Sequence, residues 1–421
     1  MLETTQSLLP ASPGGNDQLR VICVGEDDDS LDELNRLLTT MGVEPVARVM
    51  MVSRRINPAT YVGKGKLDEV KEVLVRLNAD AVILDVELSP NQLRNLEKEV
   101  GKPVMDRPGV IIEIFSRHAR TKESKTQVEL ARLQYLLPRL THFWTHFERQ
   151  RGGIGNKGMG ETQIEVDRRL VKKRMGVLRD RLEAIERERV VQRSGRKDVL
   201  KVALVGYTNA GKSTLLNALT HSKVRAEDKL FATLDASVRL LDPNSHPPIV
   251  AIDTVGFISR LPPSLVASFR STLEELHEAD LLVHVVDASA PRAKDQLEVT
   301  EKILQELGVD TKPRITVLNK VDRMKGETNR NWARLIAPGA QAISALDQAD
   351  VIKLRDLILN HFRKNLELWE IVVPYSESKL EAQLHQHGSI EQIRHIERGT
   401  FYRLRIDEGW ARKLDLARYR T

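Results

Sequence analysis

Residues 206–213 read GYTNAGKS and match G-x-x-x-x-G-K-[ST], the phosphate-binding loop. The apolar run KVALV precedes this loop and STLLNALT follows it, so the loop joins a strand to a helix. Its glycines let backbone N–H groups approach phosphate oxygens, and the helix N-terminus adds partial positive charge. Lys212 would reach the β- and γ-phosphates, and the Ser213 hydroxyl would ligate Mg²⁺. The residues expected at the nucleotide here are Gly206, Tyr207, Thr208, Asn209, Ala210, Gly211, Lys212 and Ser213.

The segment Asp253-Thr254-Val255-Gly256 ends the apolar run IVAI, 47 residues after Gly206. In proteins with a phosphate-binding loop, a carboxylate at this strand end holds Mg²⁺ through water. Gly256 would offer its N–H to the γ-phosphate. We therefore expect these four residues to line the same site.

The segment Asn319-Lys320-Val321-Asp322 ends the run RITVL and selects the base. An aspartate accepts hydrogen bonds from guanine N1–H and N2–H₂, a donor pair that adenine lacks. A site whose buried acceptor stays unpaired discriminates by several kcal/mol. The motif thus selects GTP over ATP, and Ser344-Ala345-Leu346 would complete the base site through a backbone N–H to guanine O6.

A threonine between Ser213 and Asp253 should close over Mg²⁺ when the γ-phosphate is present. We assign Thr233, in Phe231-Ala232-Thr233-Leu234-Asp235, because Thr220 falls too early, in the helix after the loop. This five-residue segment should contact the nucleotide and become ordered only with GTP. The predicted catalytic residues are Lys212, Thr233 and Gly256, and the predicted metal ligands are Ser213, Thr233 and, through water, Asp253.

One expected catalytic group is missing. Phe257 follows Gly256, where many small GTPases have a glutamine that orients the attacking water. Arg239 and Arg260 could supply an arginine finger, but we favour ordinary surface arginines. We predict slow intrinsic hydrolysis that a partner accelerates.

The elements around these motifs indicate an α/β protein. Strand-like and helical stretches alternate over residues 19–110 and again over 199–366, as in largely parallel sheets. We predict a P-loop GTPase domain with an N-terminal α/β domain, a helical hairpin and a small C-terminal α+β appendage. The expected boundaries are 1–18 for a disordered tail, 19–115 for the N-terminal domain, 116–195 for the hairpin, 199–366 for the GTPase domain and 367–421 for the appendage.

The hairpin is predicted from two leucine-rich seams. The apolar positions Leu130, Leu133, Leu137 and Leu140, and then Val171, Met175, Leu178, Leu182 and Ile185, step by three or four residues. Pro138 should kink or end the first helix. Between the helices, five of the nine residues from 152 to 160 are glycine.

Composition bounds the remaining possibilities. The chain has 421 residues, 41% apolar and 29% charged, which suits a soluble cytoplasmic protein with real cores. The single cysteine, Cys23, excludes a disulfide framework and a thiolate-rich metal site. No apolar run is long enough to span a bilayer.

Residues 101–200 hold 23 Lys and Arg against 13 Asp and Glu, whereas the whole chain has a net charge of +6. Such a segment suits a polyanion such as nucleic acid, or equally an ion-paired helical surface.

Taken together, these residues resemble the HflX family of ribosome-associated GTPases. The similarity runs over GYTNAGKST, LFATLD, DTVGFI and NKVD, and also over YVGKGK, LSPNQLRNLE and, above all, ERQRGGIGNKGMGETQIE. The resemblance implies a Mg²⁺-dependent GTPase that binds the large ribosomal subunit and splits or rescues stalled ribosomes under stress. It implies that the glycine-rich loop reaches ribosomal RNA, with Arg149, Arg151, Gly152, Gly153 and Lys157 as the contacts. We expect a monomer.

Other interpretations stay open. A GTPase attached to an RNA-modifying enzyme would need a second catalytic site outside 199–366, and none is evident. A membrane-surface GTPase would need an amphipathic pattern that the hairpin lacks. The segment Gly63-Lys64-Gly65-Lys66 could bind a phosphate, but a basic turn before a helix is favoured. His142 and His146 lack the glutamate of H-E-x-x-H, which excludes that zinc-protease motif.

Overall fold

A computed structural model describes the chain outside several gaps, and its contacts divide the chain into two compact units. The described residues are 8, 19–51, 56–140, 159–194, 199–220, 230–242, 245, 247–260, 275–324, 335, 337–364 and 366–420. The first unit comprises residues 1–189, 227–235 and 260–271. The second comprises residues 190–226, 236–259 and 272–421.

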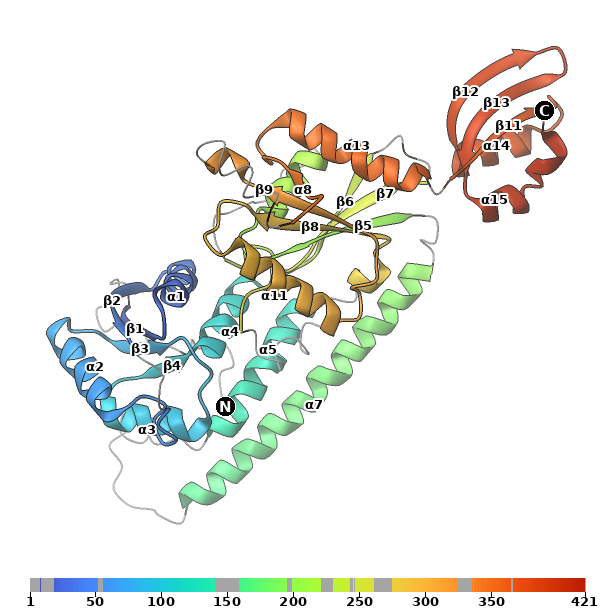
Figure 1. Cartoon of the computed structure of the whole chain (residues 1–421). Coiled ribbons are helices and arrows are strands. Elements are labelled where there is room, and N and C mark those ends of the chain that lie inside the picture. Colours follow the sequence, from blue (N-terminus) through green and yellow to red (C-terminus); the bar gives the residue numbers. More distant parts are fainter. Residues whose placement is uncertain are drawn as a thin grey trace. The chain divides into compact units, whose positions relative to one another are not determined.

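The first unit contains a parallel sheet with the strand order β2-β1-β3-β4 (Figure 1). Its strands are β1 Arg20–Gly25, β2 Glu44–Met50, β3 Ala81–Leu84 and β4 Val104–Asp106. Its helices are α1 Asp28–Thr40, α2 Lys64–Arg76, α3 Pro90–Val100 and α4 Arg107–His118. Short polar signals start the helices. Asp27 caps α1 by accepting from the Ser30 N–H, and Ser89 and Gln92 form a capping box on α3.

Two further helices of this unit form the predicted hairpin. They are α5 Lys122–Leu136 and α7 Met159–Ser194, and a short 3₁₀ turn, Leu137–Arg139, follows α5. Pro138 thus ends α5, as its missing N–H requires. The buried seam consists of Leu130, Leu133, Leu140, Val171, Met175 and Leu178, with Leu137 and Leu182 packed against it. The Arg174 guanidinium also donates two hydrogen bonds to Glu129, at 2.8 and 3.0 Å.

The second unit contains a sheet with the strand order β10-β9-β8-β5-β7-β6, in which only β6 is antiparallel to its neighbour. Its strands are β5 Leu200–Gly206, β6 Ser237–Asp242, β7 Ile249–Asp253, β8 Leu281–Asp287, β9 Arg314–Asn319 and β10 Gln341–Ala342. Its helices are α8 Lys212–Thr220, α11 Ala293–Glu306 and α13 Gln348–Lys364, with the 3₁₀ turn η2 Val321–Arg323.

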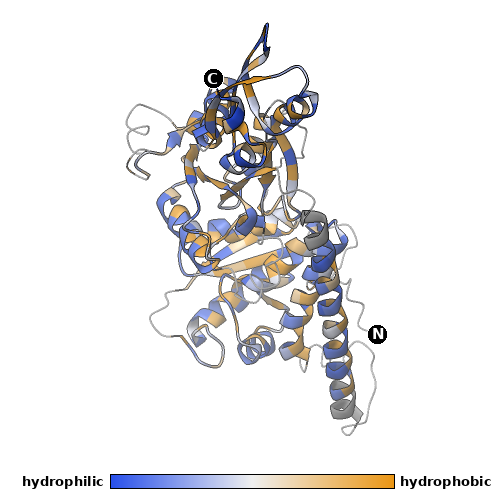
Figure 2. Ribbon diagram, turned by 90° about the vertical axis from the view of Figure 1, so that its right-hand side faces the viewer, coloured by the Kyte–Doolittle hydropathy of each residue, from blue (hydrophilic) through white to orange (hydrophobic). Residues whose placement is uncertain are grey.

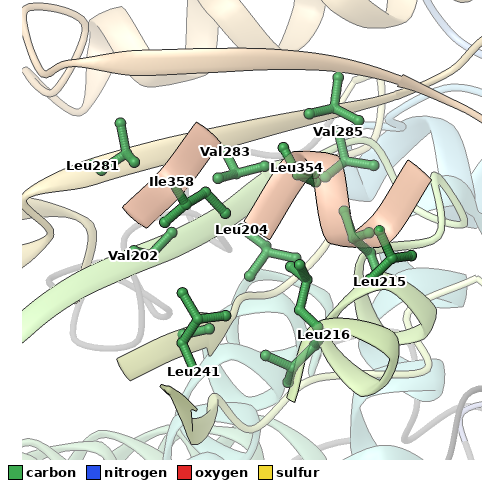
Figure 3. Packing of buried hydrophobic residues seen from close by; sticks show 14 of the residues in the cluster. Val202, Leu204, Leu215, Leu216, Leu241, Leu281, Val283, Val285, Leu354 and Ile358 are labelled. Atoms are coloured by element: carbon green, nitrogen blue, oxygen red, sulfur yellow. The ribbon is translucent and has the colours of Figure 1, made fainter. Parts of the chain in front are cut away.

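Helices cover both faces of this sheet. Val202, Leu204, Val283 and Val285 pack with α8 and α13 on one face, and Figure 3 shows these side chains with Leu354 and Ile358. On the other face, Val286 and Leu318 pack against Ala293 at the start of α11. In Figure 2 the central strands are mainly hydrophobic, whereas the helices carry both hydrophobic and hydrophilic residues. A parallel sheet buried on both faces is the arrangement that the continuous apolar strands predict.

The C-terminal segment forms a small antiparallel sheet with the strand order β11-β13-β12. Its elements are β11 Glu367–Val373, α14 Ser378–His387, β12 Ser389–Ile396, β13 Gly399–Ile406, α15 Glu408–Lys413 and the 3₁₀ turn η3 Leu416–Tyr419. Ile371, Leu384 and Leu404 are fully buried in its core. The predicted fold class is therefore confirmed. Apart from Leu8, the predicted tail lies outside the described residues, and so do the loop residues Arg149, Arg151, Gly152, Gly153 and Lys157 and the pair His142 and His146.

Candidate functional site

The phosphate-binding loop connects β5 to α8, and two of its positions admit only glycine. Gly206 has φ +150°, and a Cβ there would lie 2.1 Å from the carbonyl oxygen of Val285. Gly211 has φ +94°, and a Cβ there would lie 2.3 Å from Nδ2 of Asn319. Both positions therefore combine a backbone that favours glycine with a close backbone or side-chain neighbour. This fixes the loop at the N-terminus of α8, where anions bind.

Lys212 is buried beneath this loop. Its ammonium Nζ donates to the carbonyl oxygens of Gly206 and Tyr207, at 3.2 and 3.0 Å. The pKa of Lys212 is lowered to about 8, mainly by burial; Asp253 opposes this shift and Lys320 adds to it. Phosphate oxygens next to Nζ would favour its charged form again, because they restore the interactions that burial removes.

Ser213 and Asp253 lie next to each other as the metal prediction requires. The Ser213 Oγ donates to Oδ2 of Asp253 at 2.6 Å, and Asp253 is fully buried. β7 delivers Asp253 because it pairs in parallel with β5, whose end opens the loop. Mg²⁺ usually takes one or two carboxylates together with substrate phosphates, so this small oxygen set fits it. The described residues contain no group of three His, Cys, Asp or Glu side chains that could hold a metal by themselves.

Gly256 lies against the loop and the lysine. A Cβ at Gly256 would lie 2.8 Å from the Thr208 Cα and 3.0 Å from the Lys212 Nζ. The next residue, Phe257, exchanges backbone hydrogen bonds with the loop, accepting from Thr208 N–H at 2.6 Å and donating to Gly206 at 3.1 Å. The structure thus brings Gly256 to the region where the γ-phosphate is expected.

Asn319 connects the base motif to the loop. Its Nδ2 donates to the Ala210 carbonyl at 2.9 Å, and its Oδ1 accepts from the Ala345 N–H at 3.0 Å. Lys320 reaches the same loop, donating to the Asn209 carbonyl at 2.6 Å and to Asp287 at 2.7 Å. Two residues of the base motif, about 110 positions from the loop in sequence, are therefore joined to it directly.

Asp322 carries the predicted base specificity. It lies in η2, its side chain is exposed, and its Oδ1 accepts from the Ser344 Oγ at 2.6 Å. The Ser344 N–H is held by Asp350 at 3.0 Å. Val321 is half-buried beside Asp322, and Leu346 is 80% exposed. An exposed carboxylate at the C-terminal end of β9 suits two hydrogen bonds to a guanine edge.

Comparisons with known proteins identify GTPases, the class of protein that the motifs of this site indicate. Three family models match: GTP-binding GTPase N-terminal over residues 28–116, GTP-binding GTPase Middle Region over 118–196 and 50S ribosome-binding GTPase over 201–320. The GTPase HflX of Caldanaerobacter subterraneus is 41% identical over 381 residues, 90% of this chain and 88% of that protein. The GTPase HflX of Escherichia coli is 40% identical over 87% of each chain.

This chain belongs to the HflX family of GTPases. It is a P-loop GTPase that binds GTP and GDP and hydrolyses GTP, as predicted. A solved structure of a GTP-binding protein from Sulfolobus solfataricus, in complex with GDP, is 26% identical over 81% of this chain and 98% of that chain, with a TM-score of 0.44. Among the described helices of this HflX protein, none has both the length and the apolarity needed to cross a membrane.

The segment around Thr233 belongs to the other compact unit of this HflX protein, together with the N-terminal domain. Phe231 and Leu234 are each 2% exposed, and Ala232 and Thr233 are half-buried. The carboxylate of Asp235 accepts hydrogen bonds from the Arg120 N–H and the Thr121 Oγ1, at the start of α5. Contact of this segment with nucleotide and Mg²⁺ therefore stays a prediction. Thr220 lies in α8 with its hydroxyl bonded to Leu216 O, which agrees with its rejection as the closing threonine.

The other residues near Gly256 are buried within the fold. Thr254 donates to the Leu204 carbonyl at 2.7 Å, and Val255 and Phe257 are buried. A buried apolar residue, Phe257, thus stands at the sequence position where many GTPases have glutamine. The buried Cys23 has its pKa raised to about 12, mainly by burial, so its thiol is unreactive.

Two basic features are also explained by their surroundings. Lys64 and Lys66 lie in the first turn of α2, after its N-cap Gly63, so these residues begin the helix and do not form a separate turn before it. Arg260 is bound by Asp85, a contact that the sequence could not show because the two residues are 175 positions apart.

Proposed function

We propose that this HflX-family GTPase is a Mg²⁺-dependent factor that binds the large ribosomal subunit and its ribosomal RNA. It hydrolyses GTP slowly alone and faster on the ribosome, and it dissociates or rescues stalled ribosomes under stress. It acts as a monomer in the cytoplasm. The match of residues 201–320 to a model described as a 50S ribosome-binding GTPase supports this proposal.

The observation that carries the RNA part is a basic surface on α7. Arg168, Arg169, Lys172 and Lys173 are all exposed, and they precede or flank buried Val171 of the hairpin seam. They lie on the same helix as the end of the glycine-rich segment 152–160. Clustered exposed cations attract the phosphates of RNA and release bound counterions. We assign Arg149, Arg151, Gly152, Gly153 and Lys157 as further RNA contacts.

Within the site, Lys212 and Gly256 would bind the γ-phosphate, and Ser213 and Asp253 would hold Mg²⁺, with Thr233 joining them. Bound Mg²⁺ would neutralise charge that develops on the phosphates during transfer. Asp322 would bind the guanine, with Ser344 supporting it. The absence of a glutamine after Gly256 supports a dependence on a partner for rapid hydrolysis.

Sedimentation with purified large subunits tests the RNA contact. Replacing Arg168, Arg169, Lys172 and Lys173 by glutamine should weaken binding and flatten its salt dependence, because about 0.7 to 0.9 counterions are released per phosphate contact. The matched control replaces four exposed lysines outside the hairpin, namely Lys294, Lys302, Lys353 and Lys364. Equal binding of both variants would contradict the proposal, and binding of the intact chain to anionic vesicles instead of ribosomes would favour a membrane-surface GTPase.

A further inference from the structure

The hydroxyl of Thr208 is buried in the phosphate-binding loop. Thr208 is 6% exposed, and its Oγ1 has no hydrogen-bond partner among the described residues. A hydroxyl that leaves water without gaining a partner lowers the stability of a fold, so native proteins rarely keep one. One that persists in a substrate-binding loop is explained when the substrate supplies the missing bond.

The other hydroxyl groups of this loop and of the segment 253–256 are already bonded. The Tyr207 Oη accepts from a backbone N–H at 2.7 Å, the Ser213 Oγ donates to a carboxylate at 2.6 Å, and the Thr254 Oγ1 donates to a backbone carbonyl at 2.7 Å. Within these two described segments, the Thr208 hydroxyl is therefore the one without a protein partner.

The backbone around Thr208 is occupied as well. Its N–H donates to the Phe257 carbonyl at 2.6 Å, and the Phe257 N–H donates to the Gly206 carbonyl at 3.1 Å. The side chain is thus the part of Thr208 that can still donate a hydrogen bond. The same two bonds hold Phe257 against the loop, and its buried side chain has no hydrogen-bonding group.

The Thr208 side chain lies beside the residues that are expected to bind the γ-phosphate. A Cβ at Gly256 would lie 2.9 Å from the Thr208 Cγ2 and 3.0 Å from the Lys212 Nζ. Only a glycine allows this close approach. Because the methyl group and the hydroxyl of Thr208 share one Cβ, the hydroxyl belongs to the same region as Gly256 and Lys212.

Hydrolysis requires a polar group in this region. The attacking water must be held in line with the bond that breaks, and many GTPases use a glutamine for this purpose. A threonine hydroxyl can donate one hydrogen bond and accept two. It can therefore donate to a γ-phosphate oxygen and accept from a water at the same time. Such a group acts by orienting the reactants.

We propose that Thr208 is a catalytic residue whose hydroxyl holds the attacking water against the γ-phosphate of GTP. The water oxygen forms a bond to the γ-phosphorus, and the bond from that phosphorus to the β–γ bridging oxygen breaks, so GDP leaves with the electron pair. One proton of the water passes to an oxygen of the released phosphate, and Thr208 keeps its own proton. The proposal uses the GTPase activity of this chain and does not depend on ribosome binding.

Single-turnover hydrolysis at saturating GTP, without ribosomes, tests this role. Thr208→Val exchanges the hydroxyl for a methyl group and should lower the rate about five- to fiftyfold, as expected for losing one hydrogen bond in a charged transition state. Its affinity for GDP should change by less than about twofold, because the bond to the water is made with GTP. Thr208→Ser keeps the hydroxyl and should stay within about threefold of the intact chain.

A matched control is Thr300→Val on α11, because Thr300 is also buried but its hydroxyl donates to the Gln296 carbonyl at 2.9 Å. This variant should hydrolyse GTP at the rate of the intact chain. An unchanged rate in Thr208→Val overturns the proposal. A loss in Thr208→Ser as large as in Thr208→Val also overturns it, because the shape of the side chain and not its hydroxyl would then matter.

Thermal unfolding without nucleotide separates catalysis from a structural role. Thr208→Val removes a buried hydroxyl that has no partner among the described residues, so its melting temperature should equal or exceed that of the intact chain. A residue that only supports the loop would instead lose stability when it is changed. Slower hydrolysis that comes with a lower melting temperature and weaker GDP binding would therefore overturn the proposal.

Discussion

At the residue scale, the nucleotide motifs were predictable because phosphate and guanine chemistry requires particular residues at fixed local spacing. Gly206 and Gly211 illustrate this, since each needs a glycine for close approach as well as for its backbone. The same reasoning could not find the Arg260 contact with Asp85, because nothing local in the sequence joins positions 175 apart. It also did not indicate that the carboxylate of Asp235 binds a helix terminus.

Base selection belongs to this scale. Asp322→Asn should weaken GTP binding by about ten- to a hundredfold, because the amide nitrogen faces guanine donors instead of accepting from them. The variant should gain affinity for xanthosine triphosphate, whose base has a carbonyl at C2 in place of the amine. Competition binding with GTP, ATP and XTP measures both changes. Unaltered preference for GTP would remove Asp322 from the base site.

We expect His284 to make the stability of the second unit depend on pH. This residue in β8 is 1% exposed, and its pKa is lowered to about 3, mainly by burial and then by Arg314 and Lys212. The unfolded chain binds a proton near pH 6.5 and the folded chain does not, so stability falls as pH drops from 6.5 toward 3.

Between pH 7 and 5 this loss should be about 1–2 kcal/mol, and His284→Leu should remove it. Calorimetric unfolding of both proteins at the two pH values measures the difference. A pH dependence that is the same in both proteins would show that His284 is not its source.

At the element scale, periodicity predicted the hairpin and most strands. It did not find α4, whose sequence RPGVIIEIFSRH is apolar on nearly all sides and lacks a helical stripe. The start signal was nevertheless present, because Asp106 caps the helix and Pro108 lies in its first turn. The antiparallel edge strand β6 was also missed, since its residues are largely exposed and carry no core pattern.

The hairpin seam can be tested with two leucines on α7. Leu178→Ala removes a side chain that is 1% exposed and should destabilise the first unit by about 2–4 kcal/mol. Leu170→Ala changes a side chain that is 58% exposed and should cost less than about 0.5 kcal/mol. Denaturant unfolding followed by helix circular dichroism compares them. Similar losses in the two variants would contradict the packing of α7 against α5.

At the scale of the whole molecule, the order of motifs along the chain predicted a GTPase, and Phe257 in place of a glutamine predicted that a partner accelerates hydrolysis. The site is built from β5, β7, β9 and their loops, while the segment containing Thr233 is packed within the N-terminal unit. The packing of this segment within the N-terminal unit could not be predicted from local patterns, because it depends on tertiary contacts of residues 230–235.

The rate of GTP hydrolysis with and without purified large ribosomal subunits tests the central claim most directly. The intact chain should turn over slowly alone and at least about tenfold faster with subunits, and deletion of residues 152–160 should remove most of this stimulation while leaving the basal rate unchanged. A basal rate that already equals the rate with subunits, or full stimulation of the deletion variant, would contradict the account.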